Sequence, residues 1–188
     1  MPKIAIISAS VRKGRKSHSV ALFFQKYLAQ KQLAETEIID LDAFDFPIFE
    51  ERLRLIENPT EEMLQLAKTI TAVDGVIIVT PEYNGGYPAS LKNVIDLLYA
   101  EWKRKPIAIA TVSAGPFGGS QVITSLQFIL WKIGALPVPA MFPVAAVEKS
   151  FSEDGTPTDR EASDKRANVF VNELLYWIKA KAANETDK

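Results

Sequence analysis

The sequence predicts an α/β fold in which a parallel β-sheet is covered by helices on both faces. Apolar, β-branched runs without alternation, such as residues 76–79 (VIIV), are typical of strands that are buried on both sides. Stretches with apolar residues at helical spacing separate these runs along the chain. Because crossovers between parallel strands are right-handed, this alternation places helices on both faces of one sheet.

The first third of the chain predicts a βαβ unit followed by a long loop. Residues 4–8 form the first strand, residues 17–31 a helix and residues 37–41 the second strand. Residues 44–56 contain a proline among aromatic and charged side chains and are predicted to be a loop. Thr60 is expected to cap the next helix. The apolar residues of that helix are Met63, Leu64, Leu66, Ala67 and Ile70.

The middle of the chain adds two strands and two helices. The third strand begins at Gly75, and Ser90 is expected to cap the helix that follows it. Residues 107–112 form the fourth strand. A glycine-rich loop at residues 115–119 then leads into a largely buried helix at residues 120–133.

The last third of the chain is less regular. A short fifth strand is expected near residues 138–142, a surface turn at residues 150–157 and an amphipathic helix at residues 158–180. Three prolines bracket the strand: Pro137, Pro139 and Pro143. No linker or internal repeat divides the chain, so residues 1–183 are expected to be one domain, with residues 184–188 as a frayed tail.

The number of strands selects a strand order. Five strands without a second mononucleotide-binding half favour the flavodoxin-like order 2-1-3-4-5 over the six-stranded dinucleotide order. The expected architecture is therefore a flavodoxin-like three-layer sandwich, with helices on both faces of a five-stranded parallel sheet. In this order the first and third strands flank the switch point, where ligands bind at the carboxyl ends of the strands.

Composition excludes several classes of function. A formal net charge of −1, without a stripe of lysine and arginine, argues against a nucleic-acid partner. The chain has no cysteine and one histidine, so no disulfide, thiolate metal site or cysteine nucleophile is possible and no metal site is predicted. No apolar run reaches the length that a bilayer requires. We expect a cytoplasmic protein without a membrane partner.

The loop after the first strand has the composition of a phosphate site. Residues 8–19 (SASVRKGRKSHS) combine hydroxyls, cations and a glycine, and they open directly onto a helix whose N-terminus favours anions. Neither G-x-G-x-x-G nor G-x-x-x-x-G-K-[ST] is present, which indicates a terminal phosphate held mainly by side chains. A solvated basic loop with a serine cap is the alternative.

Two further loops leave neighbouring strands at the same edge of the predicted sheet. Residues 81–86 (PEYNGG) bring a carboxylate, a phenol, an amide and exposed backbone together, and glycines punctuate residues 113–119. Glycines needed only for packing are the alternative. A long planar ligand with one phosphate would span the three loops, and FMN has that shape.

The chain resembles the NADPH-dependent FMN reductases of flavodoxin-like fold, a family that includes quinone, azo-dye and chromate reductases. Ser10 and Arg12 match the family's serine-x-arginine phosphate signature. Ala9 stands where a glycine is frequent, and Arg15-Lys16 lengthen the loop, which leaves open whether Ser17, His18 or Ser19 touches phosphate. The most specific motif comprises Pro81-Glu82-Tyr83-Asn84, Pro88, Leu91-Lys92-Asn93 and Ile95-Asp96.

The resemblance implies a cofactor site without a catalytic side chain. The implied phosphate residues are Ser10, Arg12, Ser17, His18 and Ser19. Those lining the isoalloxazine are Pro81, Glu82, Tyr83, Asn84 and Gly85, with Ser113, Gly115, Gly118 and Gly119 at the other edge. Glu82 has a structural alternative as an ion-pair partner of Lys92. Asn93 and Asp96 are expected at a dimer contact rather than at the flavin.

The function implied by the resemblance is hydride transfer from NADPH, or NADH, through bound FMN to a small acceptor such as a quinone, flavin, azo compound or metal oxyanion. A flavodoxin-like electron carrier, or an FMN-binding protein without pyridine-nucleotide turnover, is the alternative, and a scaffold without cofactor is a third. The basic run at residues 103–105 is expected to be solvated, with the 2′-phosphate of NADPH as its alternative ligand.

The apolar content of the second half predicts self-association. Phe117, Phe128, Trp131 and Phe142 exceed what one small core requires, which favours a homodimer or homotetramer with the flavin near the interface. Packing within the core is the alternative.

Overall fold

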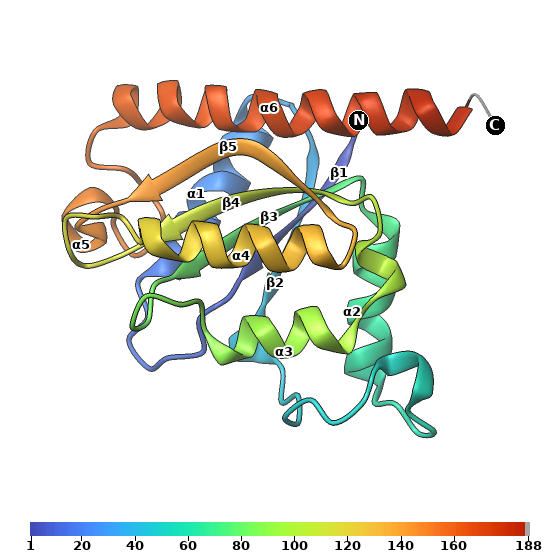
Figure 1. Cartoon of the computed structure of the whole chain (residues 1–188). Coiled ribbons are helices and arrows are strands. Elements are labelled where there is room, and N and C mark those ends of the chain that lie inside the picture. The colour runs from blue at the N-terminus through green and yellow to red at the C-terminus, as the bar shows by residue number, and fades with distance from the viewer. Residues whose placement is uncertain (187–188) are drawn as a thin grey trace.

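The computed structural model describes residues 1–186 and contains one five-stranded parallel sheet (Figure 1). Its order is β2-β1-β3-β4-β5, which confirms the predicted topology. The strands are β1 (Lys3–Ser8), β2 (Glu35–Asp40), β3 (Gly75–Pro81), β4 (Pro106–Val112) and β5 (Leu136–Val144).

Helices cover both faces of this sheet. Helices α1 (Ser17–Gln30) and α6 (Arg160–Thr186) pack on one face, and α2 (Glu61–Ala72), α3 (Ala89–Leu97) and α4 (Ser120–Lys132) pack on the other (Figure 1). Short helices complete the fold at α5 (Val147–Ser150), η1 (Leu41–Ala43), η2 (Leu53–Leu55) and η3 (Ala100–Trp102). The predicted three-layer sandwich is confirmed.

Each layer has its own apolar core. Strands β3 and β4 are almost completely buried, which explains their unbroken β-branched sequences. Between the sheet and the α1/α6 layer, Phe24 lies 4.9 Å from Phe142 and 5.2 Å from Phe170 between ring centroids. Phe142 is only 1% exposed, so its predicted surplus to the core is wrong. A fixed, well-packed sheet therefore supports the loops at its carboxyl edge.

The predicted helix caps had different outcomes. Thr60 accepts a hydrogen bond from the Met63 amide at 3.3 Å, which confirms it as the cap of α2. Ser90 does not cap α3, because that helix begins at Ala89, directly after Pro88. Instead, the Ser90 hydroxyl donates to the Ala9 carbonyl at 2.6 Å and ties α3 to the loop after β1.

Two elements at the end of the chain are longer than predicted. Strand β5 has nine residues despite its prolines, because it lies at the edge of the sheet, where a missing N–H can face outward. Helix α6 extends to Thr186, so it overlaps the predicted tail at residues 184–186, and residues 187–188 lie outside the described residues. The single domain over residues 1–183 stays a prediction.

The basic run before β4 is only partly solvated. Lys105 is 4% exposed, and its ammonium group donates to the carbonyls of Thr71, at 3.3 Å, and Val73 at the end of α2. The positive charge therefore stabilises the C-terminal end of that helix, and the predicted solvation of Lys105 is wrong. Within residues 1–186, no helix is both long and apolar enough to cross a membrane.

Candidate functional site

The loops after β1, β3 and β4 meet at the carboxyl edge of the sheet. Ser10, from the first loop, hydrogen-bonds through its hydroxyl to the Tyr83 hydroxyl of the second loop at 2.7 Å. The Glu82 amide donates to the Val112 carbonyl at 3.2 Å, which joins the second loop to the end of β4. The structure thus brings together the three segments that the sequence placed at one ligand.

The N-terminus of α1 is open toward the first loop. Its capping position is Lys16, whose side chain makes no capping hydrogen bond. Ser17 is buried, and its hydroxyl has no hydrogen-bond partner among the described residues. A buried hydroxyl without a partner is costly, so its position at an uncapped helix N-terminus is well suited to an anion.

Its two neighbours in the sequence are already engaged. The Ser19 hydroxyl donates to the Lys16 carbonyl at 2.8 Å. His18 Nδ1 lies 3.0 Å from the Ser8 hydroxyl and 3.6 Å from a carboxylate oxygen of Asp40. Of these three residues, Ser17 therefore offers the free hydroxyl to a phosphate.

The two arginines of the first loop have different environments. The Arg12 side chain is exposed beside the loop, while its amide donates to the Ser10 hydroxyl at 3.3 Å. The Arg15 guanidinium forms a two-pronged salt bridge with Asp40, the last residue of β2. Asp40 was not among the predicted site residues, although a carboxylate at the carboxyl end of a strand is a signal that could have indicated it.

This salt bridge shifts the titration of both partners. Burial raises the pKa of Asp40, but hydrogen bonds from Arg15 and the Asp42 amide outweigh it, so the pKa lies below the usual range for aspartate. The hydrogen bond to Asp40 raises the pKa of Arg15 despite partial desolvation. Both groups therefore stay charged near neutral pH.

The second loop is a tight hairpin turn. Tyr83 and Gly86 exchange two backbone hydrogen bonds of 2.8 and 3.0 Å. Asn84 (φ 54°) and Gly85 (φ 77°) are both left-handed, as a type I′ turn requires, which explains the Asn-Gly pair. The amides of Asn84 and Gly85 lie outside these two bonds and can serve a ligand.

Glu82 has a structural partner different from the predicted one. Its carboxylate accepts a hydrogen bond from the Gln121 amide at 3.3 Å, in the first turn of α4. Lys92 pairs with Asp96 on its own helix instead, so the predicted Glu82–Lys92 ion pair is wrong. Glu82 fixes the second loop to α4, where its negative charge also suits the helix dipole.

Asn93 holds the loop between β2 and α2. Its side chain accepts from the Phe49 amide at 2.6 Å and donates to the Pro47 carbonyl at 2.7 Å. The dimer contact expected for Asn93 and Asp96 stays a prediction.

The third loop combines packing glycines with an open position. A Cβ on Gly118 would lie 2.9 Å from Pro143, and one on Gly119 would lie 3.2 Å from Thr111. Both residues also have positive φ angles, of 62° and 72°, so both positions favour glycine. Gly115 has open space around its Cα. The Ser113 hydroxyl donates to the Gly115 carbonyl at 3.0 Å and shapes this end of the loop.

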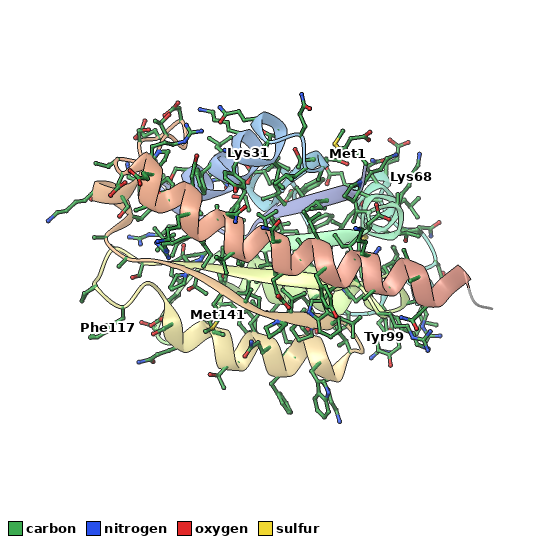
Figure 2. All side chains as sticks on the ribbon, turned by 90° about the horizontal axis from the view of Figure 1, so that it is seen from above. Met1, Lys31, Lys68, Tyr99, Phe117 and Met141 are labelled. Atoms are coloured by element: carbon green, nitrogen blue, oxygen red, sulfur yellow. The ribbon has the colours of Figure 1, made fainter. Side chains whose placement is uncertain are left out.

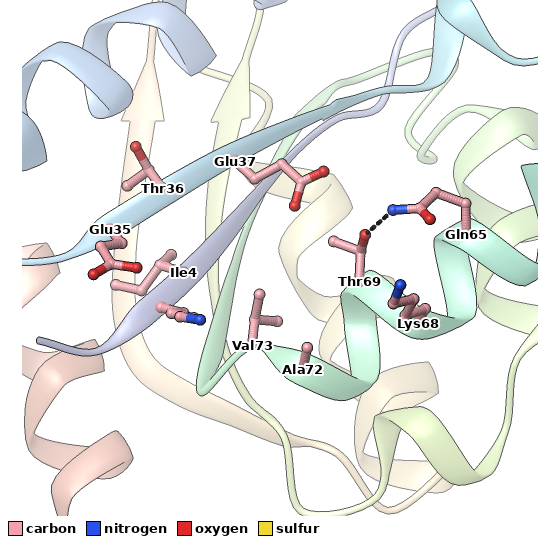
Figure 3. Close-up of a pocket in the computed structure, with 10 residues that line it drawn as sticks. Ile4, Glu35, Thr36, Glu37, Gln65, Lys68, Thr69, Ala72 and Val73 are labelled. Carbon is pink, nitrogen blue, oxygen red and sulfur yellow. Dashed lines mark hydrogen bonds between the residues drawn. The ribbon is translucent and has the colours of Figure 1, made fainter.

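One cavity of the protein lies away from the three loops. A cavity of about 370 Å³ lies at the amino ends of β1 and β2, where Glu37 points toward α2 and Glu35 lies at the other end, beside Ile4 (Figure 3). It is at the opposite edge of the sheet from the three loops. It therefore does not contribute to the candidate site.

The residues at the carboxyl edge fit FMN. The uncapped helix, the free Ser17 hydroxyl and the exposed Arg12 offer donors and positive charge to a phosphate. The hairpin amides and the open backbone at Gly115 can approach a flat ring.

Comparison with known proteins gives a consistent result. The model of the NADPH-dependent FMN reductase family matches residues 2–149. An NAD(P)H-dependent FMN reductase of Saccharomyces cerevisiae is 33% identical over 141 residues, which cover 68% of this chain and 73% of that protein. A quinone reductase of Pseudomonas putida is 30% identical over 189 residues, 96% of each chain.

A solved structure extends the similarity to three dimensions. FerB, a flavoenzyme NAD(P)H:(acceptor) oxidoreductase from Paracoccus denitrificans, superimposes with a TM-score of 0.77 and 27% identity, covering 96% of this chain and 98% of its own. The family match spans most of the sequence and all three loops of the site. The chain belongs to the NADPH-dependent FMN reductase family.

Proposed function

We propose that this protein is an FMN-dependent NAD(P)H oxidoreductase that reduces a small acceptor. The observation that carries the proposal is the unpartnered, buried Ser17 hydroxyl at the uncapped N-terminus of α1. The same loop is bonded to the Tyr83 hairpin through Ser10. A phosphate site and a planar-ring site are thereby joined at one edge of the sheet, as FMN requires.

In this proposal the protein binds and orients the cofactor. Ser10, Arg12 and Ser17 hold the phosphate. His18 and Ser19, in the first turn of α1, support the phosphate-binding loop that precedes this helix. Residues 81–85 line one side of the isoalloxazine ring, and Ser113, Gly115, Gly118 and Gly119 the other. Bound FMN supplies the hydride chemistry between a nicotinamide donor and the acceptor.

The backbone amides of the Asn84-Gly85 hairpin can interact electrostatically with the ring. Because Asn84 and Gly85 keep their amides outside the turn's own hydrogen bonds, these groups can donate to the pyrimidine oxygens of the ring. Fixed donors aimed at developing negative charge stabilise the reduced ring.

The acceptor class follows from the relatives. They include quinone reductases and an NADPH azoreductase of Bacillus, so we propose quinones and azo compounds first, with flavins and metal oxyanions as further candidates. The cytoplasmic location stays a prediction.

We also propose a homodimer, or a tetramer built from it. Phe128 and Trp131 on α4 are 60% and 64% exposed. Phe117, on the loop before that helix, is 79% exposed and is labelled in Figure 2. Phe128 and Trp131 lie side by side, with 6.0 Å between their ring centroids, and large apolar side chains that are exposed together are typical of interfaces. Phe117 belongs to the third loop, so an interface that includes it would place the cofactor near the partner subunit.

Anaerobic titration tests the proposed activity. The purified protein is reconstituted with FMN, and the flavin absorbance is followed after addition of NADPH or NADH, then after addition of a quinone or azo dye. We expect bleaching by at least one nucleotide and recovery by the acceptor. Binding of FMN without bleaching would instead favour an electron carrier, and failure to bind FMN would refute the proposal.

A further inference from the structure

Arg15 connects the phosphate-binding loop to the end of β2. One of its guanidinium nitrogens donates to the Ser10 carbonyl at 2.7 Å and also to one carboxylate oxygen of Asp40. Its other terminal nitrogen donates to the second carboxylate oxygen of Asp40 at 2.5 Å and lies 3.5 Å from Asp42. The Arg15 and Asp40 side chains are only 15% and 23% exposed, so solvent screens this pair less than a surface pair.

We propose that Arg15 and Asp40 are positioning residues that hold the phosphate-binding loop in its binding geometry. The inference rests on the proposed FMN site and concerns Arg15, one of the two residues that lengthen this loop. A two-pronged pair between a planar guanidinium and a carboxylate fixes direction as well as distance. Arg15 also donates a hydrogen bond to the Ser10 carbonyl. It thereby fixes the positions of the Ser10 hydroxyl and of the backbone amides that follow Ser10 in the loop.

The contacts distinguish this role from direct phosphate binding. Both carboxylate oxygens of Asp40 face the Arg15 guanidinium, and Asp42 lies near it as well. The charge of Arg15 is therefore matched within the protein, whereas the exposed Arg12 remains for the phosphate. Without Arg15, the Asp40 carboxylate would lose its two guanidinium hydrogen bonds, and its negative charge would repel a phosphate dianion at the loop.

The Ser10 hydroxyl ties this loop to Tyr83, and the Ala9 carbonyl ties it to Ser90 of α3, but neither bond joins the loop to the end of β2. The Arg15 amide donates to the Arg12 carbonyl at 3.0 Å, and the Arg12 amide to the Ser10 hydroxyl at 3.3 Å. Lys16 pairs with Glu153 at 3.2 Å, but Glu153 is 90% exposed, so that pair contributes little.

Binding of FMN and of riboflavin, which lacks the phosphate, tests the inference. Dissociation constants are measured by quenching of flavin fluorescence for the wild-type protein, Arg15→Gln, Asp40→Asn, the double variant and Arg15→Lys. Lys26→Gln is the matched control, since it removes an exposed cation of α1, paired with Asp154, that lies outside the loop. We expect each single variant to weaken FMN binding about 10-fold or more, as for loss of a charged hydrogen bond.

The remaining results separate positioning from its alternatives. Riboflavin binding should change less than 2-fold, the double variant should be no weaker than either single one, and Arg15→Lys should recover part of the loss. Lys26→Gln should leave both constants near the wild-type values, because its exposed pair with Asp154 lies outside the loop.

Several outcomes would overturn the inference. Weaker FMN binding in Arg15→Gln together with unchanged or tighter binding in Asp40→Asn would make Arg15 a direct phosphate ligand. An equal loss of FMN and riboflavin would indicate general disruption of the fold. Equal affinity of the wild-type protein for the two flavins would refute the phosphate site itself, which is a failure of the proposed function rather than of the positioning role alone.

Discussion

Ser17 has opposite effects on the empty and the cofactor-bound protein. Its buried hydroxyl has no partner in the described chain, so its burial costs stability unless a ligand is bound. Ser17→Ala should leave the melting temperature of the FMN-free protein unchanged or slightly raise it. The same substitution should weaken FMN binding about 10-fold, because the phosphate loses a charge-assisted hydrogen bond. Differential scanning fluorimetry and fluorescence quenching measure the two effects.

Ser19→Ala is the matched comparison for this prediction. The Ser19 hydroxyl is bonded to the Lys16 carbonyl at 2.8 Å, so its removal costs a hydrogen bond within the protein. We expect a lower melting temperature and a smaller change in FMN affinity than for Ser17→Ala. The prediction fails if Ser19→Ala weakens FMN binding as strongly as Ser17→Ala does.

Asp40 links the stability of the fold to pH. Burial alone would raise its pKa, but the hydrogen bonds from Arg15 and the Asp42 amide, together with the positive charge of Arg15, lower it in the folded protein. A carboxyl group whose pKa is lower in the folded than in the unfolded protein stabilises the fold. Its contribution to the free energy of unfolding is fully present at pH values above its unfolded-state pKa of about 3.9, and it is lost as the pH falls through its folded-state pKa. The free energy of unfolding, measured in urea from pH 3 to pH 7, should therefore fall toward acid more steeply in the wild-type protein than in Asp40→Asn. Parallel curves would contradict this.

At the scale of elements, the Asn84-Gly85 hairpin depends on its backbone conformation. Gly85 has φ 77°, and a Cβ there would lie 3.2 Å from the Gln121 side chain. Gly85→Ala should lower the free energy of unfolding by about 1–2 kcal/mol, the cost of a left-handed conformation with a side chain. Gly86→Ala is the control, because its Cβ would meet the Tyr83 carbonyl at an ordinary 3.7 Å. Equal losses in urea unfolding would refute this explanation.

The elements that the sequence predicted well are those with a strong local signal. The buried run at residues 76–79 and the Thr60 cap are set by neighbours in the sequence, and both are confirmed. The prediction that Ser90 caps α3 was wrong, because Pro88 occupies the capping position and the Ser90 hydroxyl donates to the Ala9 carbonyl in another loop. Strand β5 was underestimated, because only its edge position makes its prolines tolerable.

The site shows the same division between local and distant signals. The loops and their edge of the sheet could be predicted, since strand order alone brings them together. The partners of Glu82 and Arg15 could not be predicted. The Gln121 backbone amide comes close to Glu82 only when α4 is in place, and Asp40 comes close to Arg15 only when β2 is in place. Spatial pairing of this kind leaves no periodic trace in a sequence.

At the scale of the whole molecule, α4 has two apolar sides, of which one is buried and the other is exposed. Val122, Leu126 and Leu130 are buried against the sheet. Phe128 and Trp131 point away from this core and lie 6.0 Å apart between ring centroids. Burial of such side chains against a second copy would remove apolar surface from water and stabilise a dimer.

This surface predicts how the assembly responds to mutation. The wild-type protein should sediment as a dimer or tetramer at micromolar concentration, and the double variant Phe128→Lys with Trp131→Lys should sediment as a smaller species, because charge repels across an apolar contact. Tyr176→Lys is the control, since this 64% exposed side chain lies on α6, in the opposite layer. A monomeric wild-type protein, or dissociation caused by Tyr176→Lys alone, would show that the α4 surface is not the interface.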